Sequence, residues 1–137
     1  MKESEIAHLG MIQDVVSRMA SNSFALKALA MTLASAVLAF SGSVDEPKWM
    51  YPLAGMLPQL VFWYLDAKYL RLERLYRRLY DEVRAGQLSS SFSMETSAFK
   101  SEVSSTIRIA FSWSVLWFYL FIQSALLLSF MALLDWF

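Results

Sequence analysis

The feature that most constrains this chain is a run of 26 residues, 109–134, that contains no charged side chain. As a helix, such a run is longer than the ~30 Å hydrocarbon core of a bilayer, so it predicts a membrane-spanning helix. Residues 24–40 form an apolar run of 17 residues interrupted only by Lys27, and residues 50–65 form another of 16. Each of these spans about 25 Å as a helix, and Lys27 can extend its ammonium group to the membrane surface. We therefore expect an all-α membrane protein with three transmembrane helices.

The composition agrees with a membrane protein. Hydrophobic residues make up 57% of the 137 residues and charged residues 18%, against roughly half and a quarter in an ordinary soluble domain. A chain of this length leaves no room for an enzyme domain beside the membrane helices. We therefore expect one membrane domain, residues 1–137.

Few side chains are available for chemistry. The chain has no cysteine and one histidine, His8, which lies six residues from Asp14. That spacing differs from the i,i+4 spacing of a helical metal pair. The arginines are not accompanied by a glycine-rich phosphate loop, so a nucleotide site is not supported. The formal net charge is zero, so the chain lacks the positive field that favours nucleic acids. We expect no enzymatic activity, no metal or cofactor, and no nucleic-acid partner.

The basic residues indicate an orientation. Residues 66–108 contain eight of the 12 Lys and Arg residues, whereas the connection 41–49 contains only Lys48, beside Asp45 and Glu46. Cytoplasmic loops are enriched in Lys and Arg. The N-terminus and residues 66–108 are therefore expected in the cytoplasm, and the C-terminus on the far side of the membrane.

Two further segments adjoin the expected spans on the cytoplasmic side. Residues 1–23 have apolar side chains at helical spacing, which predicts an amphipathic helix with a break or cap at residues 21–23. The second span is expected to continue from residue 65 to 84 as a cytoplasmic helix of roughly 28 Å. Residues 85–106 begin with Ala-Gly and are rich in serine, which predicts a loop.

The cytoplasmic helix carries an apolar seam whose spacing alternates between four and three residues, as at the a and d positions of a coiled coil. The seam consists of Leu65, Tyr69, Leu72, Tyr76, Leu79 and Val83. Fewer than three heptads are marginal alone, so the seam requires another helix. It is either an oligomer or partner interface, or it packs on the N-terminal amphipathic helix of the same chain; the sequence favours neither.

The same helix is rich in basic residues close to the expected membrane surface. They are Lys68, Arg71, Arg74, Arg77 and Arg78. Their position favours contact with anionic lipid headgroups. Glu73 and Glu82 stand at i,i+4 spacing to two of the arginines, which predicts two ion pairs along the helix.

The third apolar segment offers a polar stripe. Arg108, Ser112 and Gln123 fall within about 60° of one another at 100° per residue. Such a stripe can line a water-filled path in an oligomer, although ordinary hydrogen bonding between helices is the favoured interpretation. On the second span, Gln59 is expected to bond across the bundle and Asp66 to lie at the interface.

Three stretches of the sequence resemble a known family. They are RMASNSFALKALAMT (18–32), FWYLDAKYLRLERLYRRLYDEVR (62–84) and FSMET (92–96). They are similar to a widespread, largely uncharacterised family of small bacterial inner-membrane proteins, and the resemblance extends over most of the chain. It implies several spans and a cytoplasmic helix, with some members encoded beside phage-defence genes. Members usually have a bulky residue where this chain has Ala28.

These features together lead to two functional hypotheses. The first is a small inner-membrane protein that self-assembles through its helices and perturbs or gates the membrane, as an effector of antiphage defence. The alternative is a membrane anchor or adaptor whose cytoplasmic helix recruits a soluble partner protein. The expected partners are membrane lipids in both cases and further copies of the chain in the first. In a bacterial inner membrane, the orientation expected from the basic residues places the C-terminus in the periplasm.

Overall fold

The computed structural model describes residues 3–43, 49–86, 94, 96, 100 and 103–134. Its regular elements are four α-helices: α1 (Glu3–Ser43), α2 (Met50–Arg84), α3 (Thr106–Ala110) and α4 (Trp113–Leu134). The expected all-helical fold is therefore confirmed. Most of the connection 41–49, most of the serine-rich segment 85–106, and the C-terminal residues 135–137 lie outside the described residues.

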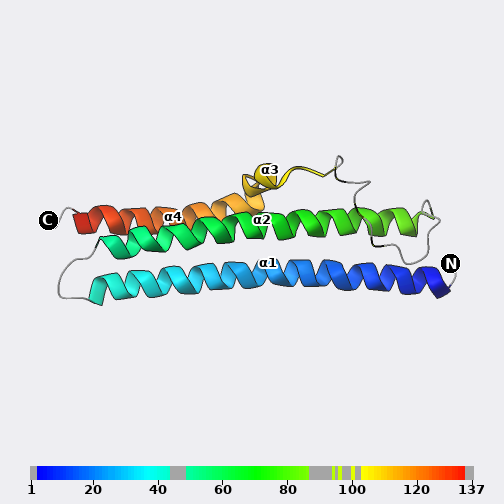
Figure 1. Ribbon diagram of the computed structural model, residues 1–137, viewed down its shortest axis with the longest axis horizontal. Coiled ribbons are helices and arrows are strands. Elements are labelled where there is room, and N and C mark those ends of the chain that lie inside the picture. The colour runs from blue at the N-terminus through cyan, green and yellow to red at the C-terminus, as the bar shows by residue number, and fades with distance from the viewer. Residues whose placement is uncertain are drawn as a thin grey trace.

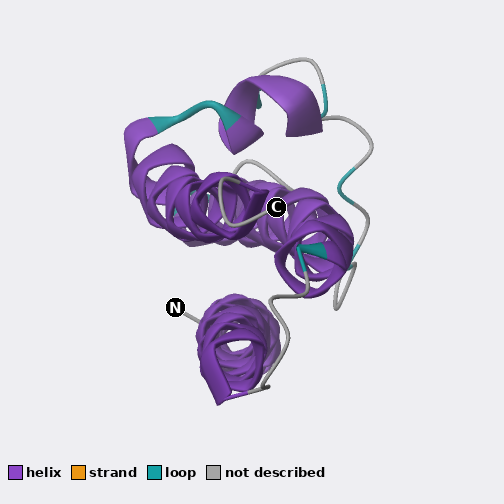
Figure 2. Ribbon diagram, turned by 90° about the vertical axis from the view of Figure 1, so that its left-hand side faces the viewer, coloured by secondary structure: helices purple, strands orange, loops and turns teal. Residues whose placement is uncertain are grey.

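Two long antiparallel helices, α1 and α2, run side by side along the whole molecule (Figure 1). The shorter α4 covers only the half of α2 that adjoins the connection to α1, and the short α3 lies across α2 where α4 begins (Figures 1 and 2). The molecule therefore has a three-helix half, made of residues 24–43, 50–66 and α4, and a two-helix half, made of residues 3–23 and 67–86.

The first helix is continuous, which corrects the expected division at residues 21–23. It extends over 41 residues, or about 60 Å. Serine and asparagine favour helix caps because their side chains compete for backbone hydrogen bonds. Here Ser23 is buried and its hydroxyl donates to Asp66 of α2 instead, so this serine does not end the helix.

The two-helix half has its own apolar core. Leu9, Ile12 and Val16 of α1 pack against Leu75, Leu79 and Val83 of α2. Leu72 and Tyr76, also members of the apolar seam, lie against this cluster. Within one chain, α1 therefore covers the C-terminal part of the seam. This agrees with the possibility that the seam packs on the N-terminal helix of the same chain.

The core of the three-helix half combines small and large side chains. Ala30 and Ala34 of α1 let the neighbouring helices approach, and Tyr119, Ile122 and Leu126 of α4 fill the space beside them. Close approach recurs further along, where a Cβ added to Gly55 would lie 3.0 Å from a methyl group of Val37. Small residues thus hold α1 and α2 together inside this half.

The last apolar segment is broken, which corrects the single helix expected over 109–134. The helix α3 ends at Ala110 and α4 starts at Trp113. Side chains bond the carbonyl groups at this break: Ser112 Oγ donates to the Ile109 carbonyl at 2.6 Å, and Trp63 Nε1 donates to the Ala110 carbonyl at 2.8 Å. These bonds stabilise a turn in place of a continuous helix.

The exposed apolar surface is concentrated in one half of the molecule. Among the described residues, the exposed large hydrophobic side chains lie in the three-helix half and on or beside α3, apart from Ile6 and Met11. Two helices, Glu3–Gly42 and Trp113–Leu134, are long and apolar enough to cross a membrane. A bilayer is the solvent in which such an exposed apolar surface is stable.

Candidate functional site

A charged pair lies at the junction of the two halves. The Lys27 ammonium of α1 is 2.5 Å from Asp66 Oδ2 of α2. The Ser23 hydroxyl donates to Asp66 Oδ1, and Lys27 Nζ donates to Ser23 Oγ at 3.0 Å. The Asp66 side chain is fully buried, whereas the Lys27 side chain keeps 26% of its exposure. Both carboxylate oxygens are therefore bonded, which offsets the cost of removing this charge from water.

The spacing of residues along α1 places two members of this cluster on the same face of the helix. Ser23 and Lys27 are one turn apart and share the face of α1 that packs on α2. The antiparallel register of the two helices brings Asp66 opposite them, in line with the Gly55 and Val37 contact further along the same interface.

The third helix adds a tyrosine to the cluster. Tyr119 of α4 is fully buried, its hydroxyl interacts electrostatically with Asp66, and its ring stacks on Trp63 with 6.1 Å between ring centroids. The hydroxyl oxygen has no hydrogen-bond partner of standard geometry among the described residues. Polar groups from α1 and α4 thus lie around Asp66 of α2.

Two glutamines extend the buried polar groups further into the three-helix half. Gln59 Nε2 donates to the Ala30 carbonyl at 2.9 Å, and Gln123 Nε2 donates to the Met56 carbonyl at 3.2 Å. The side-chain oxygens of both glutamines are buried without a hydrogen-bond partner in the described part of the chain. The expected bond of Gln59 across the bundle is therefore confirmed.

These groups form what we call the polar column. It consists of Ser23, Lys27, Asp66, Tyr119, Gln59 and Gln123. From Asp66 to Met56, whose carbonyl binds Gln123, α2 advances by about 15 Å. That is half the thickness of a hydrocarbon core. The column thus reaches from the junction of the two halves into the middle of the apolar half.

The polar stripe expected from the sequence is not assembled as a unit. Arg108 is exposed on α3, Ser112 lies in the break before α4, and Gln123 faces α2. The 100° rotation per residue assumed for the stripe does not hold across the break. Gln123 is the member of the stripe that belongs to the polar column.

The seam and the basic residues have varied surroundings. Leu79 and Val83 are buried, while Leu65 and Tyr69 are half-buried. Of the basic group, the exposed members are Lys68, Arg74, Arg77 and Arg78. The interface role of the seam and the headgroup role of the exposed basic residues stay predictions.

The side chains of three of these arginines bond within the chain. Arg71 is half-buried and its Nε donates to the Ser104 carbonyl at 3.1 Å, so it ties the segment before α3 to α2. The two expected i,i+4 ion pairs are confirmed, with Arg77 2.8 Å from Glu73 and Arg78 3.3 Å from Glu82. These exposed pairs contribute little individually.

The apolar runs of the sequence predict that Lys27 reaches the membrane surface, but no local pattern connects Lys27 with Asp66. A signal for the pair is nevertheless present. Lys27 interrupts the first apolar run, and Asp66 ends the second. Both residues lie about 20 residues from the middle of the connection between the two runs. In an antiparallel helical hairpin, positions at equal distance from the turn lie opposite each other.

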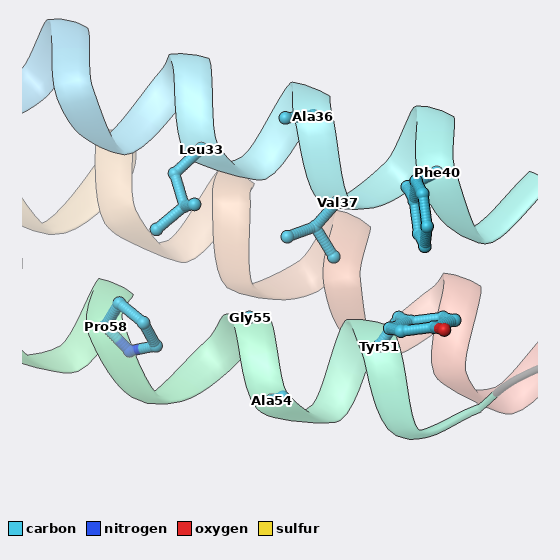
Figure 3. A pocket seen from close by; sticks show the side chains of 8 residues that line it. All are labelled: Leu33, Ala36, Val37, Phe40, Tyr51, Ala54, Gly55 and Pro58. Carbon is cyan, nitrogen blue, oxygen red and sulfur yellow. The ribbon is translucent and has the colours of Figure 1, made fainter.

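An apolar groove of about 400 Å³ lies between α1 and α2 near the far end of the three-helix half (Figure 3). Phe40 and Tyr51 mark one end, with ring centroids 5.1 Å apart, and Leu33 and Pro58 mark the other. The groove offers no charged group, so it carries no chemistry of its own. Among the described residues, no three His, Cys, Asp or Glu side chains gather as metal ligands would.

No protein-family model, curated protein or solved structure matches this chain.

Proposed function

We propose that this protein crosses the bacterial inner membrane three times, with the three-helix half in the bilayer and the two-helix half in the cytoplasm. The pattern of exposure along α2 supports this: its last exposed hydrophobic residue is Tyr64, and the next exposed residue is Lys68. The helix α4, with 22 residues, is about as long as the hydrocarbon core is thick.

Aromatic residues support the same placement. Trp49 contacts Phe130 at the far end of the three-helix half, with ring centroids 6.0 Å apart. Trp113, at the start of α4, is 78% exposed. Tryptophan and tyrosine concentrate at the two surfaces of a membrane. The excess of basic residues on α2 beyond Tyr64 then favours a cytoplasmic two-helix half.

We further propose that the protein self-assembles and perturbs or gates the membrane. The polar column is the observation that carries this proposal. Ionisable and amide side chains inside a membrane bundle are costly, and they commonly mark paths for ions or protons. Here a charged pair lies at the junction with the two-helix half, and two glutamines lie inside a half whose outer surface is apolar.

Membrane potential, measured with a voltage-sensitive dye in bacteria that express the chain, tests this function. The wild-type protein is expected to depolarise the membrane. Gln123→Leu should reduce the depolarisation several-fold at equal membrane abundance, because it removes a buried amide from the polar column. Ser124→Leu is the matched control, since Ser124 is the adjacent residue and is exposed. Equal depolarisation by both variants would contradict a role for the column.

A role in antiphage defence is proposed from the family resemblance alone. Bacteria that carry the gene in its native setting should form fewer plaques on phage infection than bacteria without it, and Gln123→Leu should lower this protection. Equal plating efficiency with and without the gene would refute the role in defence and leave the membrane activity to be judged by depolarisation.

The adaptor function is the second candidate. An open pocket of about 390 Å³ on the two-helix half supports this function. Its lining includes Arg18, Tyr76 and Met94, which offer a partner protein charged, aromatic and apolar contacts. A soluble protein should then co-purify in a fixed ratio and be lost with Tyr69→Ala and Tyr76→Ala. Depolarisation by the purified chain in vesicles would favour the first function instead.

A further inference from the structure

The short helix α3 lies at the depth of the proposed cytoplasmic membrane surface. Arg71 Nε of α2 donates to the Ser104 carbonyl before α3, and Trp63 Nε1 donates to the Ala110 carbonyl at its end. These two bonds hold α3 across α2, beside residues 63–71 (Figures 1 and 2). Within this stretch the exposed side chains of α2 change from apolar to charged.

An open apolar pocket of about 160 Å³ lies between α3 and α2. It is lined by Leu60, Trp63, Tyr64, Ile107, Ala110 and Phe111. The lining residues of α2 all precede Lys68, so the pocket faces the apolar part of the bilayer just beneath its cytoplasmic surface. Because water is absent from the hydrocarbon region, a lipid chain is what fills an apolar pocket there.

Basic residues adjoin this pocket on its cytoplasmic side. Arg108 is two residues before Ala110, or about 200° around the helix, so it lies on the side of α3 opposite the pocket. Lys68 is one turn beyond Tyr64 on α2, and both bases are exposed. Arg71 adds a third charge, and its bonds go to backbone carbonyl groups. No carboxylate among the described residues pairs with any of the three.

The carboxylates nearby on α2 are already used. Asp66 and Glu73 are each paired with another base. Further along the helix, Arg78 and Arg84 are paired with acidic residues of α2 itself. The three bases around α3 therefore differ from those arginines, because they lie at the membrane surface without a counter-charge. Such bases attract phosphate groups, with which lysine and arginine form charge-assisted hydrogen bonds.

We propose that α3 and the adjoining face of α2 bind one anionic phospholipid of the cytoplasmic leaflet, at what we call the α3 site. An acyl chain of the lipid lies in the apolar pocket, and its phosphate group lies against Lys68 and Arg108. A phospholipid fits because it joins an apolar chain to a negative charge at the depth where the pocket meets the bases. A free phosphate ion would leave the pocket unfilled. This inference rests on the proposed placement in the membrane.

Retention of lipid by the full chain tests the α3 site. The protein is reconstituted into vesicles of phosphatidylcholine alone, or of phosphatidylcholine and phosphatidylglycerol in equal amounts. It is then extracted in mild detergent and weighed by native mass spectrometry. From the mixed vesicles, the wild-type chain should retain one phosphatidylglycerol, and at least several-fold less phosphatidylcholine. Lys68→Gln with Arg108→Gln should lose most of the retained phosphatidylglycerol.

Arg78→Gln with Arg84→Gln is the matched control. It removes the same charge from α2, but from arginines that already pair with carboxylates. This control should retain phosphatidylglycerol as the wild-type chain does. An equal loss in the two double variants would refute the α3 site and assign lipid retention to the charge of the whole basic helix.

Flotation of the vesicles in a density gradient separates this inference from the membrane placement on which it rests. A double variant at Lys68 and Arg108 that floats with the vesicles but has lost phosphatidylglycerol supports the α3 site. A wild-type chain that floats with both kinds of vesicle and retains no phosphatidylglycerol refutes the site and leaves the placement standing. A wild-type chain that floats with neither refutes both.

Discussion

The carboxylate of Asp66 depends on Lys27 for its counter-charge, with Nζ 2.5 Å from Oδ2. Lys27→Met should destabilise the protein by about 3 kcal/mol, the low end of the usual cost of breaking a buried pair, because the lysine side chain is partly exposed. The double variant Lys27→Met with Asp66→Leu should recover most of this loss, since it removes both charges. Thermal unfolding in detergent, followed by circular dichroism, measures the stability of the wild-type protein, the single variant and the double variant.

Ser23→Ala provides the comparison within the same cluster. It removes one hydrogen bond from Asp66 but leaves the ammonium in place. Its cost should be smaller than that of Lys27→Met, at about 1–2 kcal/mol. A double variant at Lys27 and Asp66 that is no more stable than Lys27→Met would show that the charge of Asp66 is not what the lysine offsets.

The packing between α1 and α2 differs along the length of their interface. In the two-helix half Leu79 is fully buried against α1, so Leu79→Ala should cost about 2–5 kcal/mol through lost burial and the cavity left behind. Leu65 is only half-buried, and Leu65→Ala should cost less. Unfolding curves measure the two costs. A change in oligomer mass with Leu79→Ala and no loss of stability would instead assign the seam to assembly.

In the three-helix half the same two helices meet through a glycine. A Cβ at position 55 would lie 3.0 Å from one methyl group of Val37 and 3.2 Å from the other. Gly55→Val should therefore destabilise the helix pair by about 1–3 kcal/mol through overpacking. Adding Val37→Ala should recover part of the loss, because it removes the methyl groups in the way. Independent, additive effects of the two substitutions in a double-mutant cycle would contradict this close approach.

The orientation of the chain in the membrane can be tested with single cysteines, since none is present in the sequence. Met50 and Arg84 are exposed at opposite ends of α2. A membrane-impermeant thiol reagent added to spheroplasts should label Met50→Cys and spare Arg84→Cys. After the membrane is opened, both should be labelled. Labelling of Arg84→Cys in intact spheroplasts would contradict a cytoplasmic two-helix half.

Much of the candidate site was beyond prediction from local patterns. Gln59 was expected to bond across the bundle because an amide in an apolar run needs a partner, and it does. Asp66 and Lys27 lie 39 residues apart, and only the register of the helical hairpin brings them together. The stripe through Arg108 and Ser112 assumed an uninterrupted helix. Side chains that bond the carbonyl groups of residues 109 and 110 break that helix.

Composition and local spacing were enough to predict the helical class, the long apolar segments and the ion pairs of Arg77 and Arg78 with their i,i+4 partners. Each of these depends on composition or on spacing within a single helix, which the chain carries locally. Packing between the helices makes residues 3–43 one helix, lets α1 cover part of the seam on α2, and brings Lys27 and Asp66 together. These outcomes depend on contacts between distant segments, where burial and hydrogen bonding with another helix outweigh local preference.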